Sequence, residues 1–188
     1  GLMLASATRH NAAATASPAV ATDSAPRAWG VYAAIAVSGL SALGAEVTWT
    51  RLLSLMIGGT VYTFSIILAV FLVGLGIGSS LGAVLARGAQ PRRALGICQL
   101  LLAVAISWTA YQLTRSLPFW PISPSLSYDI WNQFQLDIVR CGWALFPPAL
   151  LWGASFPLAL AAVTVAGRDP GRVVGGIYAA NTVGAIVG

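Results

Sequence analysis

Two charged residues, Glu46 and Arg51, lie within an apolar run, residues 29–57, that is long enough to cross a bilayer. A charge at bilayer depth costs about 2.5–3.5 kcal/mol on insertion scales, so both side chains are expected to face protein or water. Their spacing corresponds to a rotation of about 140° on an ideal helix, which does not match an i,i+4 ion pair. Arg51 lies nearer the end of the run and can extend toward the membrane surface. Glu46 lies deeper and needs a protein partner, water or a proton.

Glu46 therefore has two interpretations that the sequence leaves open. It can be a proton or cation site, or a structural polar clamp between helices. Asn181 is the other deep polar residue. A hydrogen bond from its amide across helices is worth about 0.6–2 kcal/mol, so a structural role is favoured for it. Asn181 is also a candidate neighbour of Glu46.

Other reactive side chains form no recognisable constellation. The sequence has no Ser-His-Asp set, no paired carboxylates on a soluble domain and no phosphate loop, so no catalytic motif is assigned. His10 has no companion ligands, and we expect neither a metal site nor a cofactor. Cys98 and Cys141 are predicted near opposite membrane surfaces, too far apart for a disulfide.

The composition identifies a polytopic membrane protein. The 188 residues are 57% hydrophobic and 8% charged, against about 25% charged residues in soluble domains. The net charge of +5 comes from arginines in short segments between apolar runs. Membrane topology explains them better than nucleic-acid binding does.

The apolar runs predict an all-α transmembrane helix bundle. Residues 1–28 are expected to form a flexible tail, and residues 29–188 the membrane domain. Helices are predicted at about 29–57, 60–86, 94–113, 139–166 and 173–188. The last run is expected to continue beyond Gly188 in a longer protein. The predicted outer loop, residues 114–137, contains three prolines early, then aromatic residues that suit a membrane-surface helix or an aromatic belt.

Loop charge predicts the orientation. With the N-terminus inside, seven arginines lie on the inner side and two on the outer side. The inner arginines are Arg9, Arg27, Arg87, Arg92, Arg93, Arg168 and Arg172, and the outer ones are Arg115 and Arg140. Positive charge concentrates in cytoplasmic loops. We therefore expect a multi-pass membrane protein with a cytoplasmic N-terminus.

Two helices contain residues that affect packing. Gly74, Gly78 and Gly82 are spaced by four, which places them on one helix face where backbones can approach closely. A substrate path along this face is the less favoured alternative. Three prolines, Pro147, Pro148 and Pro157, predict kinks in the helix at 139–166. Such kinks occur in transporter binding sites, but more often as plain packing features.

Two blocks of this sequence carry a family resemblance. The first, residues 38–83, contains Glu46, Trp49, Arg51, Leu52, Gly58, Phe64, Phe71, Leu72, Gly74, Leu75, Gly76 and Gly78. The second, residues 153–160 and 171–188, contains Gly175, Tyr178, Asn181, Thr182 and Gly184. In both blocks the chain resembles the membrane part of bacterial membrane-bound spermidine synthase-like proteins, where a transporter-like part precedes an aminopropyltransferase-like domain.

The resemblance implies a membrane domain of the bacterial inner membrane that is similar to a half of the major facilitator superfamily. The basic loop with Arg87, Arg92 and Arg93 matches the one between that superfamily's second and third helices, although Ala86 replaces its acidic residue. The implied role is to anchor a downstream soluble domain and to bind or transport a small cationic solute. The alternatives are an accessory subunit that packs against other membrane helices, and the membrane part of an enzyme whose catalytic domain lies beyond residue 188.

Overall fold

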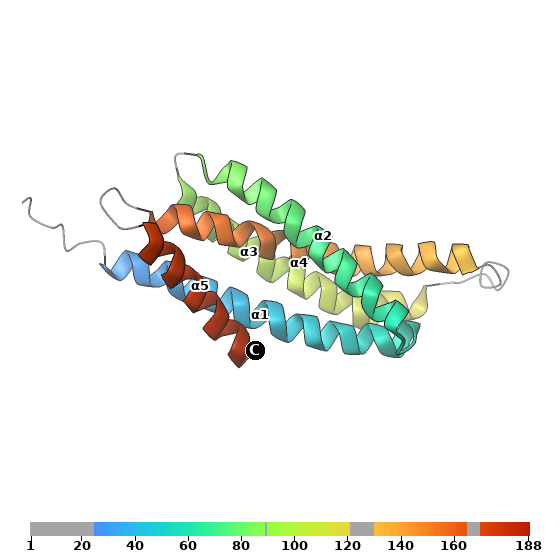
Figure 1. Cartoon of the computed structure of the whole chain (residues 1–188). Helices are drawn as coiled ribbons and strands as arrows, with labels where there is room; N and C mark the ends of the chain where they lie inside the picture. Colours follow the sequence, from blue (N-terminus) through green and yellow to red (C-terminus); the bar gives the residue numbers. More distant parts are fainter. Residues whose placement is uncertain (1–24, 89, 121–129, 165–169) are drawn as a thin grey trace, which may run out of the picture.

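The computed structural model describes residues 25–88, 90–120, 130–164 and 170–188, and all the regular structure in these ranges is helical (Figure 1). The long helices are α1 (Ala25–Ile57), α2 (Val61–Leu85), α3 (Pro91–Tyr111), α4 (Ile130–Val163) and α5 (Pro170–Val187). A π-helical turn, Gln112–Ser116, and a 3-10 turn, Leu117–Phe119, extend α3. Most of the predicted tail, residues 1–24, lies outside the described ranges.

The helices form a bundle suited to a membrane. Segments Trp29–Ile57, Val61–Leu85, Pro91–Phe119 and Ile130–Val163 are each long and apolar enough to cross one. The exposed face of α2 shows why, since Leu72, Val73 and Val84 are each more than half exposed. An apolar face of this kind is stable in lipid rather than in water.

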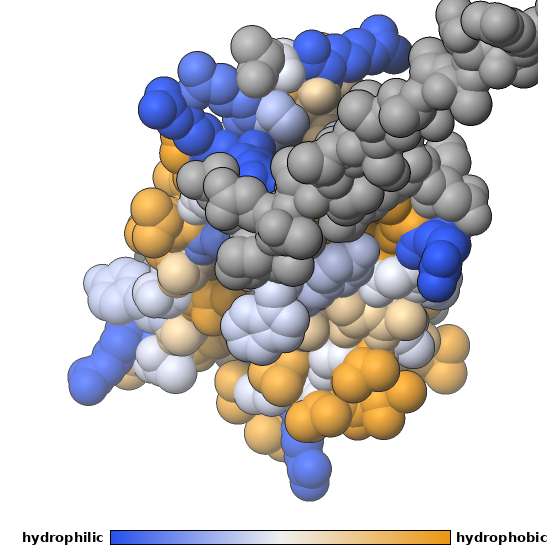
Figure 2. All heavy atoms as spheres, turned by 90° about the vertical axis from the view of Figure 1, so that its left-hand side faces the viewer, coloured by the Kyte–Doolittle hydropathy of each residue, from blue (hydrophilic) through white to orange (hydrophobic). Residues whose placement is uncertain are grey.

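One end of the bundle is rich in arginine. The turn between α2 and α3 and the start of α5 meet there, with exposed Arg87, Arg93 and Arg172. Figure 2 looks onto this end and shows hydrophilic residues around its rim. We call it the arginine-rich end. The opposite end holds the turn between α1 and α2 and the start of α4.

Close backbone packing joins α2 to α4. The three glycines Gly74, Gly78 and Gly82 are all buried on the side of α2 that faces α4. A Cβ at Gly78 would collide with the carbonyl oxygen of Leu150, and one at Gly74 would lie 2.6 Å from the Cβ of Ala149. The predicted small-residue face is therefore occupied by a helix of the same chain.

α4 continues through its three prolines, Pro147, Pro148 and Pro157, as one helix. A proline has no N–H group, so the carbonyl four residues earlier loses its helical donor. Pro147 and Pro148 release the carbonyls of Trp143 and Ala144 in this way. Side chains of α3 provide both missing donors. The Trp108 indole donates to Trp143 O at 3.4 Å, and the Thr109 hydroxyl donates to Ala144 O at 2.6 Å. Such replacement donors allow prolines in membrane helices.

α5 packs mainly along α1. Gly184 lies against the carbonyl of Ala36, and Gly39 lies against the backbone of Asn181. The buried side chains form two clusters. Trp49, Phe71 and Trp152 belong to the first, and Ile35, Leu158 and Ile177 to the second.

The observed helix ends differ from the predicted ones, most of all in α4. It begins at Ile130, so residues 130–137 of the predicted outer loop form the first part of α4 and not a separate surface helix. The predicted start of this helix at residue 139 followed hydropathy, which identifies the residues that lie within the membrane and not the full length of the helix. The helix extends further because residues 130–138, IWNQFQLDI, contain neither proline nor glycine. Similarly, α1 begins at Ala25, and α5 begins at Pro170, where proline suits a first turn.

Candidate functional site

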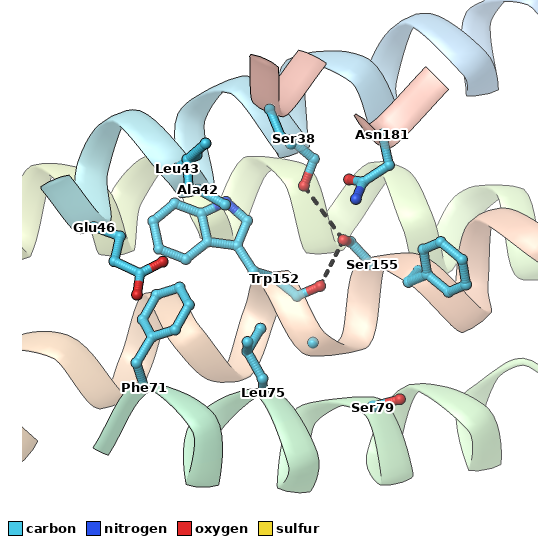
Figure 3. Close-up of a pocket in the computed structure, with 14 residues that line it drawn as sticks. Ser38, Ala42, Leu43, Glu46, Phe71, Leu75, Ser79, Trp152, Ser155 and Asn181 are labelled. Atoms are coloured by element: carbon cyan, nitrogen blue, oxygen red, sulfur yellow. Dashed lines mark hydrogen bonds between the residues drawn. The ribbon is translucent and has the colours of Figure 1, made fainter. Parts of the chain in front are cut away.

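A cavity of about 370 Å³ lies between α1, α2, α4 and α5. Ser38, Ala42 and Glu46 line it from α1, Phe71, Leu75 and Ser79 from α2, Trp152, Ser155 and Phe156 from α4, and Asn181 and Ala185 from α5 (Figure 3). Pockets for small ligands are commonly this large, mostly apolar and equipped with a few polar groups. The structure thus brings Glu46 and Asn181, which are far apart in sequence, to one site.

Aromatic rings form one wall of the cavity. The Trp152 ring lies with its centroid 5.8 Å from that of Phe71 and 5.6 Å from that of Trp49. These spacings are those of tilted aromatic pairs. In Figure 3 the Glu46 carboxyl points toward the rings of Phe71 and Trp152. A carboxylate beside aromatic faces is the arrangement that a cationic group favours.

A polar network holds the aromatic wall in place. The Trp152 indole donates to the Ser41 hydroxyl at 3.2 Å, and that hydroxyl donates to the Ser38 carbonyl at 3.0 Å. The hydroxyls of Ser38 and Ser155 lie 3.3 Å apart, and the Ser155 hydroxyl donates to Trp152 O at 2.7 Å. These bonds join α1 to α4 at membrane depth. They fix the Trp152 ring without using Glu46.

Asn181 completes the cavity from α5. Its backbone packs against Gly39, a contact that only a glycine allows because a Cβ there would meet the Asn181 carbonyl. Figure 3 shows its amide directed toward Ser38 and Ser155. Among the described residues, no hydrogen bond holds the amide, so its donors and acceptor can serve a bound molecule.

Glu46 and Arg51 do not form an ion pair. Both border a second depression, of about 430 Å³, on the adjacent side of α1. Arg51 is exposed, whereas Glu46 is half-buried and also faces the main cavity. Within the described ranges the single ion pair joins Arg140 to Asp137, at 3.9 Å. The carboxyl of Glu46 is thus left without a protein cation there.

Asp137 is a buried acid that the sequence analysis assigned to a loop. It lies two turns into α4, is 3% exposed, and pairs with Arg140 one turn later. The Tyr62 hydroxyl also donates to it, at 3.5 Å. The three-residue spacing of Asp137 and Arg140 suits an ion pair on a helix, and this was the sequence signal that could have identified Asp137 as a helical residue. Arg140 compensates the charge of Asp137 within the protein, and Asp137 does not line the cavity.

The basic loop has a structural contact rather than a place in the cavity. Arg92 donates from Nε to the carbonyl of Ala162 at 3.0 Å, in the last turn of α4. All three arginines of the loop, Arg87, Arg92 and Arg93, are exposed. Cys98 and Cys141 are buried and free. No cluster of metal-binding side chains occurs in the described part of the chain.

Comparisons of the chain with protein-family models, curated proteins and solved structures give no match.

Proposed function

We propose that the chain is a membrane domain that binds a small cationic solute, with Glu46 as the anionic group of the site. The observation that carries this proposal is the position of Glu46. Its carboxyl borders a 370 Å³ cavity, faces aromatic rings and has no cationic partner among the described residues. An intramembrane acid without a protein partner requires another source of compensation, which a bound cation or a proton supplies.

The surroundings of Glu46 favour a solute site over a purely structural clamp. The hydrogen bonds that join α1 to α4 run through Ser38, Ser41, Trp152 and Ser155. Glu46 takes no part in this network. Removing its charge is therefore expected to impair binding more than folding.

The same proposal extends to family and location. On the resemblance of residues 38–83 and 171–188, we assign the domain to the membrane part of a spermidine synthase-like protein, related to a major facilitator half. The arginine-rich end would face the cytoplasm of a bacterial cell. A downstream soluble domain would carry any aminopropyltransferase-like chemistry.

The accessory-subunit alternative loses one of its two supports. It assigned the face of Gly74, Gly78 and Gly82 to partner helices, but α4 of the same chain covers that face. The predicted aromatic loop is its other support, and residues 121–129 of that loop lie outside the described ranges.

The test is replacement of Glu46 by Gln, which keeps the size and removes the charge. We expect binding or uptake of organic cations to be lost while the melting temperature in detergent changes little. Asp137→Asn is the matched control, because it removes a buried carboxylate that does not line the cavity. Unchanged cation binding by correctly folded Glu46→Gln protein would refute the proposal.

A further inference from the structure

We propose that the cavity selects organic cations with a single positive charge and an apolar tail, and discriminates against diamines and polyamines. This inference rests on the proposed function and names the substrate class of the same site. The proposed selectivity differs from the polyamine binding that a relation to spermidine synthase-like proteins would suggest. Three features of the cavity carry it: its charge, its lining and its size.

The first feature is the number of charges. Among the residues that line the cavity, Glu46 alone is ionisable, and the other polar groups are the hydroxyls of Ser38, Ser79 and Ser155 and the amide of Asn181. One carboxylate compensates one ammonium group. A second ammonium would lose its hydration and gain only neutral partners, which is unfavourable in a site of low dielectric constant.

In the described ranges, no second acid is placed near the cavity to assist. Asp137 is the other carboxylate in the described part of the chain, and Arg140 already pairs with it. It also lies fifteen residues before Trp152 on α4, which is about 22 Å along the helix axis. The nearest charge to Glu46 along α1 is the cation Arg51, which borders the adjacent depression. Its charge adds repulsion against a second ammonium group.

The second feature is the apolar lining. Phe71, Leu75, Trp152 and Phe156 cover the surface that a ligand tail would contact. An aromatic face also attracts an ammonium group within about 6 Å of the ring. The Trp152 ring is fixed by Ser41 and by its neighbouring rings, so little side-chain order is lost on binding. A methylene chain next to a single ammonium group matches this surface.

The third feature is size. A volume of 370 Å³ corresponds to about a dozen water molecules at about 30 Å³ each. A six-carbon amine fits within it. The hydroxyls of Ser38 and Ser155 and the amide of Asn181 lie at the end of the cavity away from Glu46 (Figure 3), so a second ammonium group there would find hydrogen-bonding groups but no second negative charge.

The experiment compares three six-carbon ligands of different charge and adds the longer triamine spermidine. Hexylammonium, 1,6-diaminohexane, spermidine and 1-hexanol are titrated by calorimetry into the whole chain in detergent, with empty micelles as the blank. We expect hexylammonium to bind at least 10-fold more tightly than 1,6-diaminohexane, and spermidine to bind more weakly still. In Glu46→Gln protein, hexylammonium should lose its advantage over 1-hexanol. Glu46→Asp, which keeps the charge, should retain part of it.

The outcomes separate the two proposals. Tighter binding of 1,6-diaminohexane or spermidine, abolished by Glu46→Gln, would overturn the selectivity and keep Glu46 as a cation site. Binding of no amine would overturn both. A preference for hexylammonium that persists in Glu46→Gln protein would show that the aromatic wall, and not the charge, selects the ligand.

Discussion

The hydroxyl of Thr109 donates to the carbonyl oxygen of Ala144 at 2.6 Å, and that carbonyl is the one that Pro148 leaves without a helical donor. In the same way, the Trp108 indole N–H donates at 3.4 Å to the carbonyl oxygen of Trp143, which Pro147 leaves without a helical donor. Two consecutive residues of α3 thus compensate two consecutive prolines of α4. This pairing explains how α4 passes through a Pro-Pro pair at membrane depth and still presents Trp152 and Ser155 to the cavity.

Replacing Thr109 by Val should destabilise the bundle. Valine keeps the shape and removes the hydroxyl, so the carbonyl of Ala144 would be buried without a donor. We expect a loss of about 1–2 kcal/mol in the free energy of unfolding. The measurement is thermal or denaturant unfolding in detergent micelles.

Thr114→Val is the matched control for that measurement. The Thr114 hydroxyl is exposed and donates to Ala110 O within its own helix, at 2.7 Å. It compensates no proline, so its loss should change stability by less than about 0.5 kcal/mol. Equal effects of the two variants would show that the Thr109 bond has no special role.

The contact between α2 and α4 should be sensitive to one methyl group at Gly78. A Cβ there would collide with the carbonyl of Leu150, a backbone atom that cannot move without moving α4. We expect Gly78→Ala to destabilise the protein by about 1–3 kcal/mol, the usual range for overpacking. It should also weaken cation binding, because α2 and α4 both line the cavity.

Gly76→Ala provides the comparison on the same helix. Gly76 is exposed, and no atom lies within 4 Å of a Cβ built on it. Alanine has the higher helix propensity, so this variant should be neutral or more stable. A melting temperature of Gly78→Ala at or above that of Gly76→Ala would contradict the close packing described for the two helices.

Periodicity and hydropathy predicted the features of this chain that depend on one helix at a time. Four-residue spacing gave the buried glycine face of α2, and apolar length gave the membrane-spanning runs. The start of α4 was missed because residues 130–138 are polar enough to lie outside a bilayer and yet contain no proline or glycine to end a helix. Asp137 was assigned to a loop for the same reason.

The site depends on contacts between helices, which a single sequence does not contain. The rotation between Glu46 and Arg51 excluded a helical ion pair, but it did not say what Glu46 faces. The answer requires the position of α5 against α1, where Gly39 admits the backbone of Asn181. The role of Trp152 was missed because an apolar helix rich in tryptophan does not indicate which ring borders a cavity.

Arg92 should matter for stability in a way that its neighbour Arg93 does not. Its Nε donates to the carbonyl of Ala162, one of the last carbonyls of α4 that lack a helical donor. A cation at a helix C-terminus also interacts favourably with the helix dipole. We expect Arg92→Gln to lower the free energy of unfolding by about 0.5–1.5 kcal/mol. Arg93→Gln removes the same charge from the next residue, which makes no such bond to α4 among the described residues, and should have no measurable effect. A comparable loss in both variants would reduce the role of Arg92 to surface charge.

The two ends of the bundle should differ in their access to a membrane-impermeant thiol reagent. The native cysteines, Cys98 and Cys141, are buried and can be replaced by Ala to give a silent background. Gln90→Cys then places one thiol at the arginine-rich end, and Phe119→Cys, at a side chain that is 77% exposed, places one at the opposite end. Because arginine concentrates on the cytoplasmic side, we expect intact bacterial cells to be labelled at Phe119→Cys only, and Gln90→Cys to be labelled after permeabilisation. The reverse pattern would place the arginine-rich end outside the cell and would refute the proposed orientation.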